Sequence, residues 1–187
     1  MTTIRTERST DIVARETILD TAYGVARFTK PSARLRDGRL PAEDLALVAV
    51  ERGRVVGTLR LWNVTAGPGC PALLLGPLAV EPSLKGEGIG KALMLHAISE
   101  AKRLGHKAIL LVGDASYYGR FGFSAEATGG LWLPGPYEKH RLLACELVAG
   151  ALDGARGLIR TPQPVPSRLA PLVAAMSRRR RPATQAA

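Results

Sequence analysis

Residues 85–90 read Lys-Gly-Glu-Gly-Ile-Gly, and they join an apolar run at 73–80 to an amphipathic run at 88–104. The three glycines remove side chains at alternate positions, so backbone N–H groups at the start of the helix are open to an anion. Lys85 and Lys91 add positive charge from either side. The loop therefore fits a pyrophosphate better than a single carboxylate, the alternative being a glycine-rich turn that only starts a helix.

Two familiar nucleotide loops do not match this stretch. A P-loop needs glycine at position 85 and serine or threonine at 92, where the chain has Lys85 and Ala92. A dinucleotide fingerprint needs a third glycine at position 91, where Lys91 stands. Both nucleotide interpretations fail on residue identity.

The elements around the loop indicate a βαβ unit. A strand at Leu73–Val80 precedes the loop, a helix at Gly88–Leu104 follows it, and Lys107–Val112 reads as a second strand. The two strands are expected to be parallel and adjacent. Pro77 lacks an N–H group inside an apolar strand, so we expect a bulge or incomplete pairing at that point.

The rest of the body predicts short alternating elements and no internal repeat. Arg52-Gly53 separates two apolar, β-branched runs and predicts a hairpin turn. The other expected elements are a strand at 3–7, a helix at 11–23, a short helix between Pro31 and Gly38 carrying Arg34 and Arg36, the hairpin strands at 45–51 and 54–64, a loop at 126–137 and a final strand at 141–148.

Length and composition favour one globular domain. The chain has 187 residues, of which 46% are hydrophobic and 22% charged, so wholesale disorder and a fibrous rod are excluded. Two cysteines cannot build a disulfide scaffold, and no Cys or His spacing resembles a metal site. No apolar run is long enough to span a bilayer. We expect a cytoplasmic protein without a metal.

The net charge of +10 lies mostly at the C-terminal end. Residues 1–154 carry a net charge of +3, whereas 155–187 hold seven arginines, five prolines and no acid. We therefore predict a domain at 1–154 and a mostly disordered basic tail at 155–187, with a weak helix signal at Leu169–Met176. The block Arg178–Arg181 is typical of a solvated end and less often contacts RNA, a ribosome or anionic lipid.

The loop resembles the pyrophosphate loop of the GNAT superfamily of N-acetyltransferases, which reads Arg or Gln, any, any, Gly, any, Gly or Ala. Lys85 replaces the first residue and keeps its charge but not the planar fork of arginine. Tyr118-Gly-Arg-Phe-Gly-Phe123 is similar to the family's Tyr-x-x-x-Gly-Phe segment. The resemblance covers residues 3–150, most specifically 73–123, and is greatest to a bacterial branch of predicted acetyltransferases with unassigned substrates.

This resemblance implies an α/β (α+β) fold in which helices flank a mixed, largely antiparallel twisted sheet. The sheet would splay between the strands at 73–80 and 107–112, and the pantetheine arm of acetyl-CoA, the cosubstrate, would lie in the gap. The coenzyme-binding residues that the resemblance implies are Leu78, Ala79, Val80, Lys85, Gly86, Glu87, Gly88, Ile89, Gly90 and Lys91.

The implied reaction moves an acetyl group to a primary amine of a small molecule or peptide by direct attack. Tyr118 is the expected general acid to the coenzyme A thiolate, with Tyr117 as its rival and packing as a core aromatic as the alternative. Candidate bases are Glu81, Glu43, Asp44 or a water chain. His96, His106 and His140 receive no role.

Two interpretations of another class remain open. The fold could hold acyl-CoA as a non-catalytic binding module while the basic tail contacts RNA or a ribosome. It could also be an oligomeric scaffold if the loop binds no anion. A homodimer is a further expectation.

Overall fold

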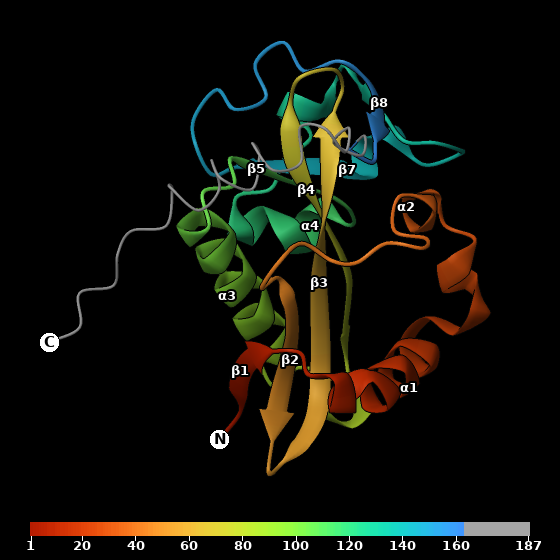
Figure 1. Cartoon of the computed structure of the whole chain (residues 1–187), viewed down its shortest axis with the longest axis vertical. Coiled ribbons are helices and arrows are strands. Elements are labelled where there is room, and N and C mark those ends of the chain that lie inside the picture. The colour runs from red at the N-terminus through yellow and green to blue at the C-terminus, as the bar shows by residue number, and fades with distance from the viewer. Residues whose placement is uncertain (163–187) are drawn as a thin grey trace, which may run out of the picture.

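A computed structural model describes residues 1–162, which form one twisted sheet with helices on both faces (Figure 1). The main strand order is β1-β2-β3-β4-β5-β7, and only the β4–β5 and β6–β8 pairs are parallel. The mixed, largely antiparallel sheet predicted above is thus confirmed. The strands are β1 (Thr3–Thr6), β2 (Ala46–Glu51), β3 (Arg54–Ala66), β4 (Pro71–Val80), β5 (Ala108–Val112), β6 (Leu131–Trp132), β7 (Leu142–Glu146) and β8 (Gly157–Arg160).

Two longer helices, α1 and α3, lie on opposite faces of the sheet. Alternate residues of β4 face opposite sides of the sheet. Ala79 packs with α1, whereas Leu78 and Val80 face the core beneath α3. The helices are α1 (Ile12–Tyr23), α2 (Pro31–Arg34), α3 (Ile89–Arg103) and α4 (Ala115–Tyr118), and single 3-10 turns occupy Ser9–Asp11, Gly24–Phe28, Pro82–Leu84, Gly119–Phe121, Glu126–Thr128 and Lys139–Arg141.

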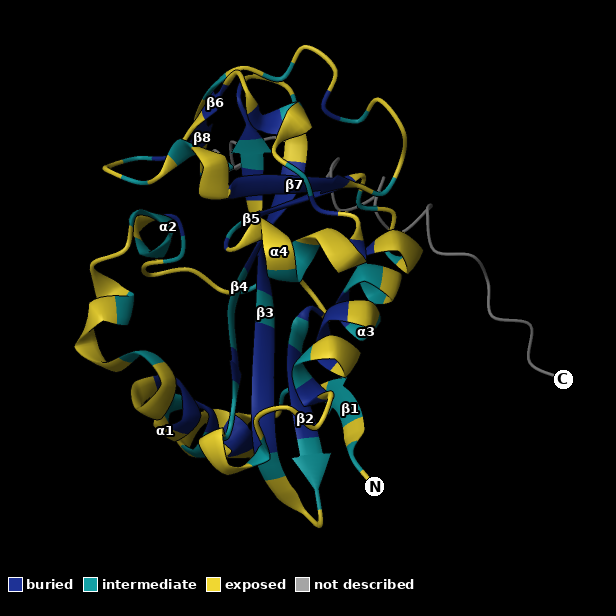
Figure 2. Ribbon diagram, turned by 180° about the vertical axis from the view of Figure 1, so that it is seen from behind, coloured by how far each residue is buried: buried dark blue, intermediate teal, exposed yellow. Residues whose placement is uncertain are grey.

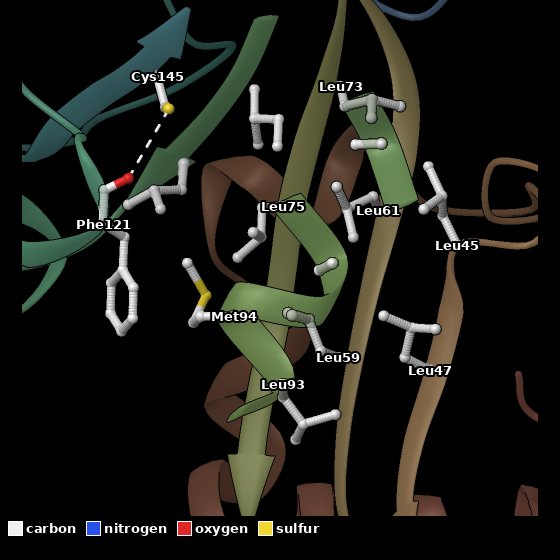
Figure 3. Close-up of a cluster of buried hydrophobic side chains, with 14 of the residues drawn as sticks. Leu45, Leu47, Leu59, Leu61, Leu73, Leu75, Leu93, Met94, Phe121 and Cys145 are labelled. Carbon is white, nitrogen blue, oxygen red and sulfur yellow. Dashed lines mark hydrogen bonds between the residues drawn. The ribbon is translucent and has the colours of Figure 1, made fainter. Parts of the chain in front are cut away.

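The main core lies between α3 and the sheet (Figure 3). The predicted apolar stripe of α3 provides one side of it, and Leu93 and Met94 are fully buried. The other side comes from leucines at alternate positions of the strands, namely Leu47, Leu59, Leu61, Leu73 and Leu75, and from Leu45 just before β2. Buried strands therefore run through the middle of the molecule, whereas the outward face of α3 is exposed (Figure 2).

Buried ion pairs fix α1 against the sheet. The carboxylate of Glu7 accepts hydrogen bonds from Arg15 of α1 at 2.5 Å and from Arg60 of β3 at 3.0 Å. The side chains of Glu7 and Arg15 are 7% and 8% exposed, so removing either partner would leave an uncompensated buried charge. This network joins α1 to β3, and the same helix ends at Tyr23, whose hydroxyl contacts Leu78 of β4.

The predicted hairpin turn is confirmed. Arg52 and Gly53 have φ values of 47° and 77°, which matches a two-residue turn with both central residues in the left-handed region. β2 and β3 pair from Ala46↔Arg60 to Glu51↔Arg54. This long hairpin carries the middle of the sheet.

The sheet splays between β4 and β5, as predicted. The two strands pair only at Leu73↔Ile109 and Leu74↔Leu110, after which β4 continues along β3. The β3–β4 register shifts between Leu59 and Leu61, opposite the segment that holds Pro77, and the indole Nε1 of Trp62 donates to the Gly76 carbonyl at 2.8 Å. A strand pair that separates after two residues leaves room for a cleft.

The strand β8 corrects the predicted boundary of the body. Residues 157–160 were assigned to the tail, but β8 pairs with Thr65 and Ala66 of β3, and Ile159 is fully buried. The prolines on which that boundary rested begin only at Pro162, whereas Gly157–Arg160 contains two branched apolar residues, Leu158 and Ile159. Arg141–Val148, assigned as the final strand, is therefore not the last one. The predicted helix at Leu169–Met176 and the block Arg178–Arg181 lie outside the described residues.

None of the helices within residues 1–162 combines the length and the hydropathy that crossing a bilayer requires.

Candidate active site

A cleft of about 810 Å³, here called the loop cleft, lies where β4 ends and α3 begins. Its walls are the end of α1, residues 78–80 of β4, the glycine loop and the first turn of α3, with Tyr117 and Arg120 at one side. All of the predicted coenzyme-binding residues line it except Glu87. Segments that lie far apart in the sequence thus form one continuous wall.

The backbone N–H groups at the start of α3 have no acceptor within the helix. The N–H of Ala92 donates to the carbonyl of Gly88 at 2.9 Å, and the N–H groups of Ile89, Gly90 and Lys91 precede that bond. No side chain caps this end. These N–H groups, with the positive end of the helix dipole, can bind an anion.

The loop itself is built by glycines in the left-handed region. Gly86 and Gly88 have φ values of 99° and 80°. Residues that carry a Cβ atom rarely adopt this backbone conformation, whereas glycine does so readily. The N–H groups of Lys85 and Glu87 donate within the loop, to the carbonyls of Pro82 at 3.2 Å and Leu84 at 3.3 Å. The backbone N–H of Glu87 therefore already has an acceptor inside the loop, and Glu87 does not line the cleft.

A second cleft of about 350 Å³, here called the splay cleft, opens where β4 and β5 separate. It is lined by residues 74–78 of β4 and by residues 111–114 at the end of β5. Tyr23, Leu78 and Tyr117 line both clefts, so the two meet at these residues. A molecule with its anionic end at the glycine loop could place its other end at this junction.

Tyr118 lines the splay cleft and packs its ring against the core. Its ring meets those of Tyr117 and Phe123 edge to face, with centroids 4.9 and 6.1 Å away. Burial, with a smaller contribution from the neighbouring tyrosines, raises the pKa of Tyr118 above its usual range. The phenol therefore keeps its proton at neutral pH, so in a proton transfer it can act as an acid but not as a base. Its catalytic role stays a prediction.

Tyr117 occupies a different position from Tyr118. It lines both clefts, and its hydroxyl lies 3.2 Å from the point where a Cβ atom on Gly90 would stand. The guanidinium of Arg120 lies over its ring, 4.8 Å from the centroid. Tyr117 thus borders the glycine loop, while Tyr118 borders the gap between the strands.

Tyr23 is a site residue that the sequence interpretation missed. Its hydroxyl donates a hydrogen bond to the carbonyl of Leu78, in the strand segment predicted to hold the pantetheine arm. Burial raises its pKa, against an opposing influence of Arg36. In the sequence Tyr23 is only the last apolar residue of a helix, so nothing local points to this role.

None of the predicted bases reaches the clefts. Glu81 pairs with Arg54 at 3.3 Å and lies elsewhere, and neither Glu43 nor Asp44 lines either cleft. Asp114 does line the splay cleft, although the sequence interpretation gave it no role. Hydrogen bonds from the backbone and side chain of Ser116 lower the pKa of Asp114, so it is a weak base.

The histidines and cysteines lie outside both clefts. His96, His106 and His140 are absent from the cleft walls. Burial raises the pKa of the Cys70 and Cys145 thiols, which makes them poor nucleophiles. Within residues 1–162 no three His, Cys, Asp or Glu side chains gather as metal ligands would.

The chain is similar in sequence to proteins of one known family. The model of the acetyltransferase (GNAT) family matches residues 13–123. An uncharacterized N-acetyltransferase of Escherichia coli K12, YhbS, is 29% identical over 117 residues, covering 62% of this chain and 70% of that protein. A second one from the same strain, YjhQ, is 30% identical over 126 residues, covering 64% of this chain and 69% of that protein.

Two solved structures of related proteins hold the coenzyme. The crystal structure of Escherichia coli YhbS in complex with CoA superposes with a TM-score of 0.74 at 26% identity, covering 86% of this chain and 89% of that one. A GNAT family acetyltransferase from Brucella melitensis in complex with acetyl-CoA has a TM-score of 0.56 at 29% identity, covering 82% of this chain and 99% of that one.

Proposed function

Because this chain belongs to the acetyltransferase (GNAT) family and is an acetyl-CoA-dependent acyltransferase, we propose that it acetylates a primary amine by direct attack on the thioester. The observation that carries the proposal is the junction of the two clefts at Leu78. One cleft ends in uncapped helix amides, and the other opens where the strands part. A long thioester with a pyrophosphate at one end fits that shape.

The coenzyme is proposed to lie along β4, with its pyrophosphate on the amides of Gly86 and of residues 88–91, because the N–H group of Glu87 already donates to Leu84. Lys85 and Lys91 are exposed and make no ion pair within residues 1–162, so their charge is available to the phosphates. The backbone of residues 78–80 would hold the pantetheine arm as a neighbouring strand would. The acetyl group then reaches the junction beside Tyr23 and Tyr117.

The chemistry consists of one acyl transfer. The amine nitrogen forms a bond to the thioester carbonyl carbon, and a strand N–H group stabilises the oxyanion that results. As the C–S bond breaks, Tyr118 donates its phenol proton to the departing sulfur. The nitrogen releases its proton to water, and water returns a proton to the Tyr118 phenolate. A phenol with a raised pKa enters this step fully protonated.

The first test is calorimetry with acetyl-CoA on the full-length protein, followed by an acceptor screen that measures free thiol. Saturable binding is expected, and a folded protein that binds no acetyl-CoA would exclude the proposal. The screen would include polyamines, aminoglycosides, amino acids and peptide N-termini.

The second test compares Tyr118→Phe with Tyr117→Phe. Loss of a general acid lowers turnover by about 10²–10⁴-fold. We expect that loss for Tyr118→Phe, with an unchanged Kd for acetyl-CoA. If Tyr117→Phe shows it instead, the roles of the two tyrosines are reversed.

The binding-module alternative gains no support from the comparisons, and the tail residues beyond 162 that it invokes lie outside the described residues. Cytoplasmic location and a homodimer stay predictions.

A further inference from the structure

Arg36 reaches the splay cleft from the turn after α2 without an acidic partner. Its Nε donates to the carbonyl of Ser32 at 3.2 Å, and its two terminal nitrogens have no hydrogen-bond or ion-pair partner within residues 1–162. The side chain is half-buried, and this burial lowers the pKa of Arg36 to about 10. The guanidinium is thus protonated at neutral pH but poorly solvated.

Two other cations of the splay cleft, Arg27 and Arg141, have carboxylate partners. Arg27 donates to Glu16 at 2.5 Å and to Asp20 at 2.8 Å, so two carboxylates offset its charge. Arg141 pairs with Glu138 at 3.3 Å. Their positive charge is largely compensated by neighbours on the same surface.

Lys30 adds a second uncompensated charge beside Arg36. Its ammonium lies 4.8 Å from the centroid of the Tyr23 ring and makes no ion pair within the described residues. The one carboxylate among the residues that line this cleft belongs to Asp114, and it accepts hydrogen bonds from the backbone N–H and the hydroxyl of Ser116. The cleft wall therefore carries an excess of positive charge next to the junction.

A half-buried cation without a counter-charge costs folding free energy. A bound anion would offset this cost by forming hydrogen bonds with the cation. A guanidinium presents a planar fork that matches the two oxygens of a carboxylate or phosphate. At the opposite end of the site, around the start of α3, Lys85 and Lys91 are available for the coenzyme phosphates. The partner of Arg36 therefore belongs to the acceptor side.

We propose that Arg36, assisted by Lys30, binds an anionic group of the acceptor, so that the substrate is an amine that also carries a carboxylate or a phosphate. This inference rests on the proposed function, since it specifies which amines the same site accepts. The inference also bears on the lack of a strong base among the cleft residues. Positive charge around the amine lowers the pKa of its ammonium form, which eases loss of the proton to water.

The test uses matched pairs of acceptors that differ only in the anion. Free amino acids are compared with their amides, and phosphoethanolamine with ethanolamine, by thiol release from acetyl-CoA. We expect the anionic member of at least one pair to have a kcat/KM higher by roughly 10- to 100-fold, the range for a hydrogen bond to a charged group. The pair that shows the difference identifies carboxylate or phosphate as the anion.

The variant Arg36→Gln should remove this preference, while Arg34→Gln should keep it. Arg34 lies two residues earlier, at the end of α2, but it is exposed and does not line the splay cleft. The Arg34→Gln variant is therefore a control for the loss of one positive charge near the cleft. Both variants should bind acetyl-CoA with the Kd of the parent. A preference that survives in Arg36→Gln would overturn the inference.

A binding measurement keeps the inference testable without turnover. Calorimetry on the CoA-loaded protein compares the N-acetyl amino acids and N-acetyl phosphoethanolamine with their uncharged counterparts. Tighter binding of the anionic product, lost in Arg36→Gln, supports the inference. Equal binding of charged and neutral products, in a protein that does bind CoA, overturns it and leaves the proposed acetyl transfer intact. Failure to bind CoA at all would instead overturn the proposed function.

Discussion

Replacing Gly113 with alanine should displace the Tyr118 ring without removing its hydroxyl. A Cβ atom on Gly113 would stand 2.2 Å from Cε2 and 2.6 Å from Cδ2 of Tyr118. Carbon atoms in contact lie about 3.5–4.0 Å apart, so the ring edge must retreat by more than about 1 Å. Gly113 has no positive φ, and alanine therefore adds no backbone strain of its own.

The expected effect on turnover is large and the effect on coenzyme binding small. A misplacement of about 1 Å in a reacting group costs on the order of 10²-fold in rate. The Kd for acetyl-CoA should stay near that of the parent, because Gly113 does not line the loop cleft. Overpacking of this kind costs about 1–3 kcal/mol of stability, so thermal unfolding is followed to confirm that the variant is folded at the assay temperature.

A matched control is available on the same segment. Gly119 has a helical φ of −56° and no atom within 4 Å of an added Cβ, so Gly119→Ala should keep the parent's turnover. If Gly113→Ala acts through the phenol, the double variant with Tyr118→Phe should be no slower than Tyr118→Phe alone. A folded Gly113→Ala protein with the turnover of the parent would refute the assignment of Tyr118.

Further outcomes are expected at the loop, in the pH profile and at the end of the body. Lys85→Gln and Lys91→Gln should each weaken acetyl-CoA binding by about 0.3–1 kcal/mol in low salt and by less in high salt, and calorimetry showing no change would argue against phosphate contact. Because its pKa is raised, Tyr118 should stay protonated past pH 10, so kcat should hold to that pH, and a decline below pH 9 would contradict its role as the acid. A chain ending at residue 154 should melt below one ending at 162, because losing the buried Ile159 alone costs about 2–5 kcal/mol, and equal melting temperatures would show that β8 adds no stability.

The residues of the loop and its flanking elements were predictable because their signals are local. The glycines at 86 and 88 need the left-handed region, and the apolar stripe of α3 repeats at helical spacing. The hairpin follows in the same way from two consecutive residues, Arg52 and Gly53, between two apolar runs. Pro77 marked the place where the sheet opens, since a residue without an N–H group weakens strand pairing.

The end of the body was not predictable from the same kind of signal. β8 is four residues long and pairs with strands more than 20 and more than 90 positions earlier in the chain. A short strand shows little periodicity, and its stability comes from partners that the local sequence does not name. The change in charge and proline content near residue 154 suggested an earlier boundary.

The sequence by itself determined that this chain forms a βαβ unit with a glycine-rich loop at the start of its helix, because turn chemistry and helical periodicity act between neighbours in the chain. Only the tertiary structure decided that Tyr23, Arg36 and Tyr118 line the same splay cleft. These side chains come from α1, from the turn after α2 and from α4, and their distance in space depends on how three separate elements pack on the sheet. The lack of an acidic partner for Arg36 is likewise a property of its surroundings in the fold. The residues next to position 36 in the sequence do not predict it.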